Sequence, residues 1–265
     1  MKRIGFVGGG KMAGAIINAL LKNGMDPARL TVSDSSAEAR ERHAAAGIFV
    51  TADNAETFTR SDLVFLAVKP QHMAEALQSV SDASAGKTVV TMAAGIRTET
   101  IRAFCPRASA VVRMMPNTPM LVNRGTIAVA FGDAPAETVE TVTGILAQAG
   151  QVFPVDESMM NVVTALSGSG PAYFYRIASV LAAEASSLGL PAETAVRMAA
   201  ETMAGAAEMM LVSGKSPETL LQDVSSAKGT TVAALEAFDE ANLDDALKNG
   251  VRAANRRAEE LAAGK

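Results

Sequence analysis

Hydrophobic residues in the first half of the chain fall into short continuous runs separated by amphipathic stretches. Strands are predicted for the runs rich in β-branched and aromatic residues, which are RIGFVG, LTVSD, IFVT, DLVFLAV, KTVVTMA and SAVVRMM. Helices are predicted between several of them, the first two over KMAGAIINALLKNG and AEARERHAAAG, closed by Gly24 and Gly47. Because the strand runs are continuous rather than alternating, both faces should be covered, which predicts a parallel sheet in an α/β fold. GTIAVAF and GQVFPV are expected to extend this sheet on either side of the helix AETVETVTGILAQAG.

From about Glu157 onward the strand-like runs stop, and Ala, Met, Leu and Glu dominate long segments with helical spacing. One helix is predicted over GPAYFYRIASVLAAEASSLG, with Pro171 in its first turn and Gly189 past its end. Further helices are predicted over PAETAVRMAAETMAGAAEMMLVSG, SPETLLQDV, TTVAALEAFDEA and LDDALKNGVRAANRRAEELAA. The chain is therefore predicted to hold an α/β domain over residues 1–158 and an all-α domain over residues 159–265.

The predicted helices of the second half carry more apolar positions than the surface of a monomer needs. Met198, Met203, Met209 and Met210 are typical of a helical core, and their density favours burial against a second subunit. The all-α domain is therefore expected to dimerise.

The composition is that of an ordinary globular protein, with 49% hydrophobic and 20% charged residues among 265. A net charge of −4, without any basic block, argues against a nucleic-acid partner. No apolar run approaches the roughly 18 residues that a membrane helix needs, and the glycine-rich start does not resemble a signal peptide. A cytoplasmic protein is expected, and its single cysteine, Cys105, fits a reducing compartment.

The histidines offer little for metal binding or nucleophilic catalysis. His43 and His72 share no metal-ligand spacing with each other or with the cysteine, so neither a metal site nor a Ser-His-Asp triad is expected. His43 lies in the polar helical run EARERHAAAG and is expected to face solvent.

The first strand and helix are joined by a glycine-rich turn, in the segment IGFVGGGKMAGAI. Gly8, Gly10 and Ala13 match the G-x-G-x-x-G/A pattern of dinucleotide-binding turns. Gly8 would make the tight turn, Gly10 would let a pyrophosphate approach the backbone, and Ala13 would let helix and strand pack closely. The unpaired N–H groups and the positive end of the helix dipole would hold the phosphates. A merely tight turn is the alternative.

The end of the second strand leaves the choice between NAD and NADP open. Asp34 lies about 20 residues beyond the glycine turn, where an acidic residue binds a ribose 2′-OH and favours NAD. Ser33, Ser35 and Ser36 are small donors that could instead surround a 2′-phosphate. Asp34 and Ser35 could also simply cap the next helix.

Two later strands end in residues suited to the nicotinamide end of a dinucleotide, because ligands of open α/β sheets bind beyond the carboxyl ends of strands. FLAVKP brings Val68, Lys69 and Pro70 to that edge, and TMAAG brings Ala93, Ala94 and Gly95. The small or apolar residues would let the ring lie close to the backbone. Lys69 is expected to contact a phosphate or ribose rather than act as a general acid.

Taken together, these segments resemble the pyrroline-5-carboxylate reductase family along nearly the whole chain. The matching motifs, in the family's order, are GFVGGGKMAGAI, FLAVKPQ, AAGI, RMMPNTP, ALSGSGPAYFY and DVSSAKGTTVAALE. The resemblance implies a Rossmann domain followed by a helical domain that dimerises, with dimers often assembling further. It implies NADPH as cofactor, with NADH used less well, and the last step of proline synthesis as the reaction.

The resemblance also implies roles for individual residues. As nucleotide contacts it implies Gly8, Gly9, Gly10, Lys11, Met12, Ala13, Ser35, Asn54, Val68, Lys69 and Ala94, to which the strand-end argument adds Ser33, Pro70, Ala93 and Gly95. Asn117, in MPNTP, is similar to a residue near the nicotinamide and substrate. Ser226, Gly229, Thr230 and Thr231 match the family's substrate loop, with Thr231 expected near the imine as the catalytic candidate.

A helix start rich in small donors suits this substrate, a small cyclic imine that carries a carboxylate. Unpaired N–H groups and the helix dipole both favour an anion, so Ser225 to Thr231, hereafter the substrate loop, is predicted to bind the carboxylate. A simple N-cap role for Thr230 or Thr231 is the alternative. The family usually shows Ser-Pro-Gly-Gly-x-Thr here, and Lys228 replaces a glycine that would have allowed a positive φ.

Two other functions share part of this sequence pattern. β-Hydroxyacid dehydrogenases also join a Rossmann domain to helices and share GSG near the junction, but a catalytic lysine is expected a few positions later. Here GSGPAYFYRIAS contains no lysine, and Arg176 is its only basic residue, which counts against an alcohol substrate that needs a general base. A non-enzymatic NADP-sensing module would need the nucleotide contacts but no substrate loop. Gly168 and Gly170 are expected to permit close packing near the cofactor crevice.

Overall fold

The computed structural model describes residues 2–263 and divides into two compact units. The first takes in residues 1–169 and 254–265, and the second takes in residues 170–253. Within residues 2–263, no helix is both long and apolar enough to cross a membrane.

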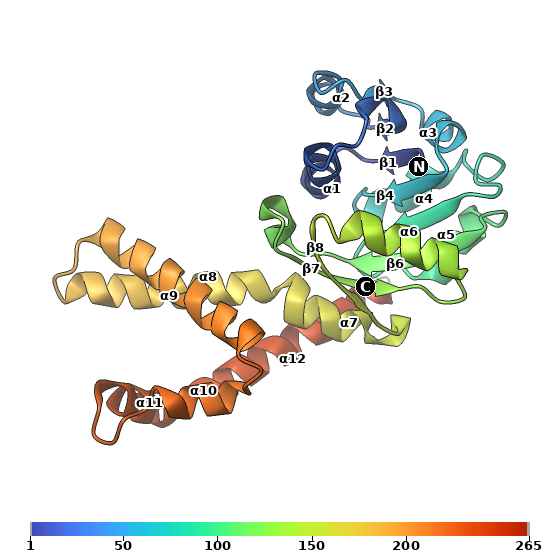
Figure 1. Cartoon of the computed structure of the whole chain (residues 1–265). Helices are drawn as coiled ribbons and strands as arrows, with labels where there is room; N and C mark the ends of the chain where they lie inside the picture. Colours follow the sequence, from blue (N-terminus) through green and yellow to red (C-terminus); the bar gives the residue numbers. More distant parts are fainter. Residues whose placement is uncertain (1, 264–265) are drawn as a thin grey trace. The chain divides into compact units, whose positions relative to one another are not determined.

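The first unit is built on one mixed β-sheet, visible in Figure 1. Its strand order is β3-β2-β1-β4-β5-β6-β7-β8. The strands are β1 Ile4–Val7, β2 Leu30–Ser33, β3 Phe49–Thr51, β4 Leu63–Leu66, β5 Thr88–Thr91, β6 Ala110–Met115, β7 Gly125–Ala130 and β8 Gly150–Pro154. The chain order reverses at β1, which pairs with β2 on one side and β4 on the other. That reversal opens a crevice at the carboxyl ends of β1 and β4.

The predicted strands are all present, but the expectation of a parallel sheet is wrong at one pair. β7 runs antiparallel to β6, with Met114 opposite Val129, and all other pairs are parallel. The physical reason is the connection, which contains only the short 3₁₀ helix η3 Thr118–Val122 and a left-handed residue, Asn123. A parallel pairing requires a longer crossover, usually through an α-helix.

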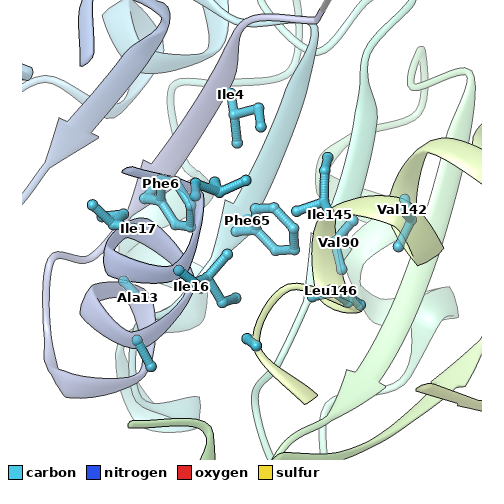
Figure 2. Packing of buried hydrophobic residues seen from close by; sticks show 14 of the residues in the cluster. Ile4, Phe6, Ala13, Ile16, Ile17, Phe65, Val90, Val142, Ile145 and Leu146 are labelled. Atoms are coloured by element: carbon cyan, nitrogen blue, oxygen red, sulfur yellow. The ribbon is translucent and has the colours of Figure 1, made fainter. Parts of the chain in front are cut away.

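Helices cover both faces of the sheet. One face is covered by α1 Lys11–Lys22 and α6 Ala136–Leu146, and the other by α3 Asn54–Arg60, α4 Met73–Leu77 and α5 Thr98–Phe104. Figure 2 shows the first face, where Ile16 of α1 and Leu146 of α6 lie against strand residues. Phe6 and Phe65, on the neighbouring strands β1 and β4, stack there with ring centroids 5.1 Å apart. As predicted, α1 and α2 Ala37–Ala44 end just before Gly24 and Gly47.

The chain leaves the sheet through an irregular helical segment that the sequence did not reveal. After η4 Glu157–Met159, α7 Met160–Val163 continues into a π-helical turn over Thr164–Gly168, labelled η5. The N–H of Ser169 donates to the carbonyl of Thr164, which closes the wider turn. Met160 packs on β7, so this segment belongs to the first unit. The chain therefore passes from the first compact unit to the second after residue 169, later than the boundary after residue 158 that the sequence predicts.

The second unit is helical, as predicted. Its helices are α8 Gly170–Ser187, α9 Ala192–Val212, α10 Pro217–Asp223, α11 Thr230–Glu240 and the first part of α12 Leu243–Ala262. α8 and α9 pack side by side as a helical hairpin (Figure 1). The last residues of α12 belong to the first unit. The backbone of Leu261 lies beside Gly95, since a Cβ added to Gly95 would lie 3.0 Å from the carbonyl carbon of Leu261.

Candidate active site

The glycine turn after β1 is held between the two neighbouring strands. Gly8 has a φ of +96°, and a Cβ on it would lie 2.9 Å from the carbonyl carbon of Ala67, after β4. Its N–H donates to the carbonyl oxygen of Ser33, at the end of β2, over 2.7 Å. A side chain is excluded here by backbone conformation and by space, which confirms the tight turn assigned to Gly8.

The start of α1 is open toward a ligand. Gly10 is the N-cap residue, with extended backbone and no side-chain cap, and a Cβ on it would meet nothing within 4 Å. Ala13 is fully buried against the sheet. The first N–H groups of the helix, from Lys11 onward, lack intrahelical partners and form the positive end of the helix dipole. Such a helix start fits a pyrophosphate.

Both backbone polar groups of Gly9, the middle glycine of the turn, are hydrogen-bonded. Its N–H donates to Oδ2 of Asp34 over 2.7 Å, and its carbonyl oxygen accepts from Nη2 of Arg42 (3.1 Å). The Nε2 of His43 lies 2.9 Å from the same oxygen, so Nε2 carries the hydrogen of that bond. The predicted phosphate contact through Gly9 thus gains no support, because its N–H is already engaged.

His43 is the clearest correction to the sequence interpretation. It was expected to face solvent, but only 6% of it is exposed, and its ring fills the space beside Gly9, where a Cβ would lie 3.0 Å from the ring. The polar character of α2 concealed this inward position, since the contact joins residues that are distant in sequence.

A cavity of about 400 Å³ lies at the carboxyl ends of β1, β2 and β4. Its lining brings together Gly8, Ser33, Asp34, Ser35, Ala52, Asn54, Val68, His72, Glu75 and Ala76. Five predicted nucleotide residues are among them, and Asn54 is fixed by donating to the carbonyl of Ala76 over 2.9 Å. Lys69 and Pro70 lie next to this cavity in sequence, at the start of the 3₁₀ helix η2 Pro70–His72, and are exposed.

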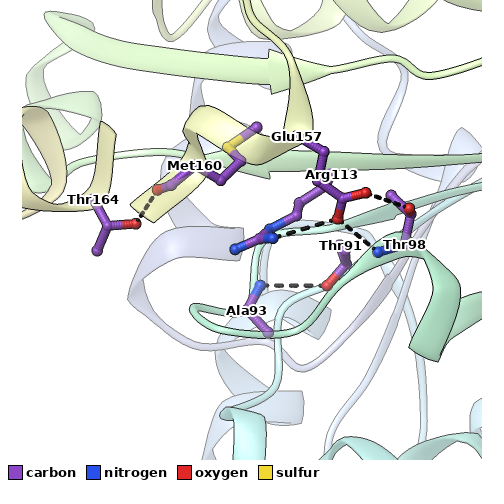
Figure 3. A network of polar contacts seen from close by, with 7 residues as sticks. All are labelled: Thr91, Ala93, Thr98, Arg113, Glu157, Met160 and Thr164. Atoms are coloured by element: carbon purple, nitrogen blue, oxygen red, sulfur yellow. Dashed lines mark hydrogen bonds and ion pairs between the residues drawn. The ribbon is translucent and has the colours of Figure 1, made fainter. Parts of the chain in front are cut away.

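The predicted residues after β5 are held by a buried polar network that the sequence did not reveal (Figure 3). Ala93 and Gly95 follow β5, and the chain then enters α5 at Thr98. Thr98 donates its N–H to Oε1 of Glu157 (2.8 Å) and its hydroxyl to Oε2 (2.6 Å). Arg113 of β6 donates to Oε1 of the same carboxylate over 3.3 Å. One carboxylate therefore fastens the loop after β5 to the neighbouring strand.

The charges in this network are shielded from water. The side chain of Arg113 is 5% exposed and that of Glu157 is 26% exposed. Burial alone would raise the pKa of Glu157, but the hydrogen bonds from Thr98 and the guanidinium of Arg113 outweigh it and lower that pKa. Burial lowers the pKa of Arg113, which still remains charged in the physiological range. No nucleotide or substrate role was expected for these residues.

Asn117 ties the end of β6 to the π-helical turn. Its Nδ2 donates to the carbonyl of Ser167 over 3.1 Å, and its Oδ1 accepts from the N–H of Thr126 over 2.9 Å. Gly168, in the same turn, packs closely against Met115, since a Cβ on it would lie 2.7 Å from Cε of Met115. The same expectation is wrong for Gly170, where a Cβ would meet nothing within 4 Å. A π-turn is often found at functional sites, and here it keeps Asn117 in place.

The substrate loop presents an uncapped helix start. Gly229 is the N-cap of α11, with extended backbone and no side-chain cap, so the alternative in which Thr230 or Thr231 caps this helix is wrong. The hydroxyl of Ser225 donates to the carbonyl of Leu221 over 2.6 Å, and the N–H of Gly229 donates to the carbonyl of Ser226 over 2.9 Å. Donors that remain in the loop include the first N–H groups of α11, the hydroxyls of Ser226, Thr230 and Thr231, and the ammonium group of the exposed Lys228.

The replacement of a family glycine by Lys228 has a visible consequence. Lys228 has a φ of +61°, so the loop keeps a conformation that favours glycine. A lysine in this region costs on the order of 1 kcal/mol in backbone strain. The positive φ that a glycine would allow is therefore present at this position.

Comparison with known proteins covers the whole chain. A pyrroline-5-carboxylate reductase from Corynebacterium melassecola is 38% identical over 98% of this chain and 99% of its own. The chain belongs to the pyrroline-5-carboxylate reductase family. Residues 157–261 match the family model described as pyrroline-5-carboxylate reductase dimerisation, and residues 3–95 match the one described as NADP oxidoreductase coenzyme F420-dependent.

Solved structures agree with this assignment. A pyrroline-5-carboxylate reductase from Coxiella burnetii superposes with a TM-score of 0.92 at 34% identity, covering 98% of both chains. A Plasmodium falciparum pyrroline carboxylate reductase, crystallised with NADP bound, shares the fold with a TM-score of 0.88 at 23% identity, again over 98% of both chains. The Rossmann-type domain followed by a helical dimerisation domain is thereby confirmed for this reductase family member.

Proposed function

We propose that this chain reduces 1-pyrroline-5-carboxylate to L-proline with NADPH as the reductant. The observation that carries the proposal is a pair of uncapped helix starts in a chain that covers 99% of the length of a relative in this family. One is at Gly10, in the dinucleotide turn, and the other is at Gly229, in the substrate loop. Each presents N–H groups that fit an anion: the pyrophosphate of the nucleotide at α1 and the carboxylate of the imino acid at α11.

The reaction makes modest demands on protein side chains. The bound reduced nicotinamide supplies the hydride, which forms a C–H bond at the imine carbon while the C=N double bond becomes single. The nitrogen is already protonated when the imine is in its electrophilic form, so a strong acid is unnecessary. The protein must hold the carboxylate and present the ring at contact distance. The small donors of the candidate site suit that requirement.

The substrate loop supplies the carboxylate contacts in this proposal. Thr230 and Thr231 each offer a backbone N–H at the start of α11 and a hydroxyl, and Ser226 offers a further hydroxyl. Hydrogen bonds to a charged group contribute about 1.5–3 kcal/mol each, so two or three would hold a small metabolite. Thr231, which is half-buried, is proposed to lie nearest the imine. Ser225 is proposed to shape the loop instead, because its hydroxyl is engaged by Leu221.

The nucleotide contacts are proposed to centre on the open start of α1 and on the cavity beside it. Lys11 and Met12 would bind the pyrophosphate through their N–H groups, with Gly10 allowing the close approach. Val68 and Asn54 line the adjoining cavity, where the adenosine ribose would lie. Lys69 and Pro70 after β4, together with Ala93, Ala94 and Gly95 after β5, would border the nicotinamide half.

We further propose that the chain is a homodimer. In the second unit, large apolar side chains are exposed along α8, α9 and the connection between them, including Leu188 (81%), Leu211 (74%) and Val196 (62%). A cavity of about 510 Å³ between α8, α11 and α12 is lined largely by apolar side chains, among them Ile177 and Leu247. Apolar surface of this extent is typical of an interface, and residues 157–261 match the dimerisation model.

The test is turnover with defined substrates. We expect oxidation of NADPH when pyrroline-5-carboxylate is added, with proline formed in equal amount. Reduction of NADP⁺ by a β-hydroxyacid, without imine reduction, would support the hydroxyacid dehydrogenase alternative. Nucleotide binding without turnover of either substrate would support the sensing module.

A substitution pair isolates the role of Thr231. Thr231→Ala is expected to lower kcat/KM for the imine by about tenfold or more, the equivalent of one charge-assisted hydrogen bond, while leaving NADPH binding intact. Thr231→Ser keeps the hydroxyl and should recover most of the activity. Unchanged kinetics in Thr231→Ala would remove this residue from the site, and lost nucleotide affinity would point to a folding defect.

A further inference from the structure

The peptide between Gly9 and Gly10 is flanked by glycine on both sides, so local sterics do not fix its orientation. Gly10 has a φ of −73°. Turning the peptide plane over would bring Gly10 into the region of positive φ, which glycine tolerates and most other residues avoid. The run of three glycines from Gly8 to Gly10 therefore needs contacts from elsewhere in the fold to select one orientation.

Two side chains of α2 make that selection. The carbonyl oxygen of Gly9 accepts from Nε2 of His43 over 2.9 Å and from Nη2 of Arg42 over 3.1 Å. A carbonyl oxygen has two lone pairs, so it can accept both hydrogen bonds at once. If the peptide turned over, the N–H of Gly10 would face these two donors and both bonds would be lost.

Glycine at position 9 makes room for the histidine. A Cβ on Gly9 would lie 3.0 Å from Cδ2 and from Nε2 of the His43 ring, and equally close to a methyl group of Val32. The ring is buried there, whereas Arg42 reaches the same oxygen from an exposed position. The missing side chain that frees the peptide to turn thus also admits the ring that holds it.

The orientation of this peptide decides where the N–H of Gly10 points. The peptide bond is trans, so that N–H is directed away from the carbonyl oxygen of Gly9 and from α2. The two preceding N–H groups are bound within the protein, that of Gly8 by the carbonyl of Ser33 and that of Gly9 by Asp34. Within residues 2–263 the N–H of Gly10 has no protein partner, and Gly10 is exposed at the start of α1.

We infer that His43 and Arg42 are positioning residues, which direct the N–H of Gly10 toward the diphosphate of the nucleotide without touching it. The inference rests on the nucleotide site of the proposed function. In the other orientation the carbonyl oxygen of Gly9 would face the diphosphate and repel it. Donors bound to that oxygen also polarise the peptide, which makes the N–H of Gly10 a stronger donor.

The experiment compares His43→Leu, which removes the donor, with His43→Gln, whose amide nitrogen can replace Nε2. Neither new side chain is charged, so the difference between the two variants reports the hydrogen bond. In calorimetry with ADP-ribose, His43→Leu should bind about three- to tenfold more weakly than the wild type, the equivalent of one hydrogen bond. His43→Gln should recover most of the affinity. Equal loss in both variants would show a packing defect and overturn the inference, as would wild-type affinity in His43→Leu.

Arg42→Met tests the second donor from an exposed position, and it decides the question if His43→Leu fails to fold. Its affinity for ADP-ribose should fall in the same range, about three- to tenfold. Arg102→Met is the matched control, because Arg102 is also an exposed arginine of the first unit but pairs with Asp133 at 3.5 Å. The control should bind ADP-ribose as the wild type does. An equal loss in Arg102→Met and Arg42→Met would show a general effect of charge and contradict the role of Arg42.

Kinetics and binding together separate this inference from the proposed reaction. In His43→Leu the KM for NADPH and the KM for NADH should rise by the same factor, because both carry the same diphosphate, while kcat stays within about twofold of the wild type. A rise for one nucleotide alone would contradict a role at the diphosphate. Binding of ADP-ribose needs no imine, so the expected order of affinities would support the inference even without turnover. Imine reduction by the wild type, with equal affinities in all variants, would leave the reaction standing and refute the positioning role.

Discussion

The carboxylate of Glu157 offers the sharpest test of how the first unit is held together. Glu157→Gln keeps the size and shape of the side chain and retains one oxygen that can accept from Thr98. It removes the negative charge beside Arg113, whose side chain is 5% exposed. The guanidinium would then be buried without a counter-ion.

The expected loss of stability follows from burial. Removing one partner of a fully buried ion pair costs about 3–5 kcal/mol, because the remaining charge is left uncompensated. Glu157 is 26% exposed, its distance to Arg113 is 3.3 Å, and the glutamine keeps part of the hydrogen bonding. These three features reduce the expected loss in free energy of unfolding to about 1.5–3 kcal/mol.

Urea unfolding of the full chain at one fixed protein concentration measures this loss, since dimerisation makes stability depend on concentration. The dependence of this stability loss on pH tests whether the charge of Glu157 causes it. The pKa of Glu157 is lowered on folding, so its contribution is complete above its ordinary pKa of 4.5 and disappears as the pH falls through the lower folded value. The difference between wild type and Glu157→Gln should therefore be full at pH 7 and shrink below pH 4.5.

Glu137→Gln is the control, because Glu137 pairs with Lys2 at 2.9 Å with 76% of its side chain exposed. Such a surface pair contributes at most about 1 kcal/mol. If Glu157→Gln shifts the urea midpoint no more than Glu137→Gln, the buried network does not stabilise the fold as argued. A loss that persists unchanged below the folded pKa would refute the electrostatic explanation and favour a packing defect.

Two further outcomes are expected. Gly8→Ala should lower NADPH affinity by about tenfold or more in a fluorescence titration, because Gly8 has a φ of +96° and a Cβ there would collide with the backbone of Ala67. Gly14→Ala should leave the affinity unchanged, because a Cβ on Gly14 meets nothing within 4 Å. Cys105 should resist alkylation in the native protein and react on unfolding in urea, since burial raises the pKa of its thiol to about 11; rapid native labelling would contradict its buried position.

Features that depend on neighbours along the chain could be predicted from the sequence alone. Hydrophobic runs identified the strands, and glycines marked the ends of α1 and α2. The motif around Gly8, Gly10 and Ala13 predicted a turn whose conformation and packing the structure confirms. These signals are local, since backbone conformation and periodicity are properties of short segments.

Which of these segments contact one another depends on the three-dimensional fold. His43 binds the Gly9 carbonyl and Glu157 joins Thr98 to Arg113, and in both cases the partners are far apart in sequence. The antiparallel direction of β7 shows only in its pairing with β6, across a connection too short for a parallel crossover. The helix start at Thr230 lacks a side-chain cap, although threonine is a good cap residue by propensity. Polar residues give no periodic signal of their partners, because a buried hydrogen bond depends on the three-dimensional position of both groups.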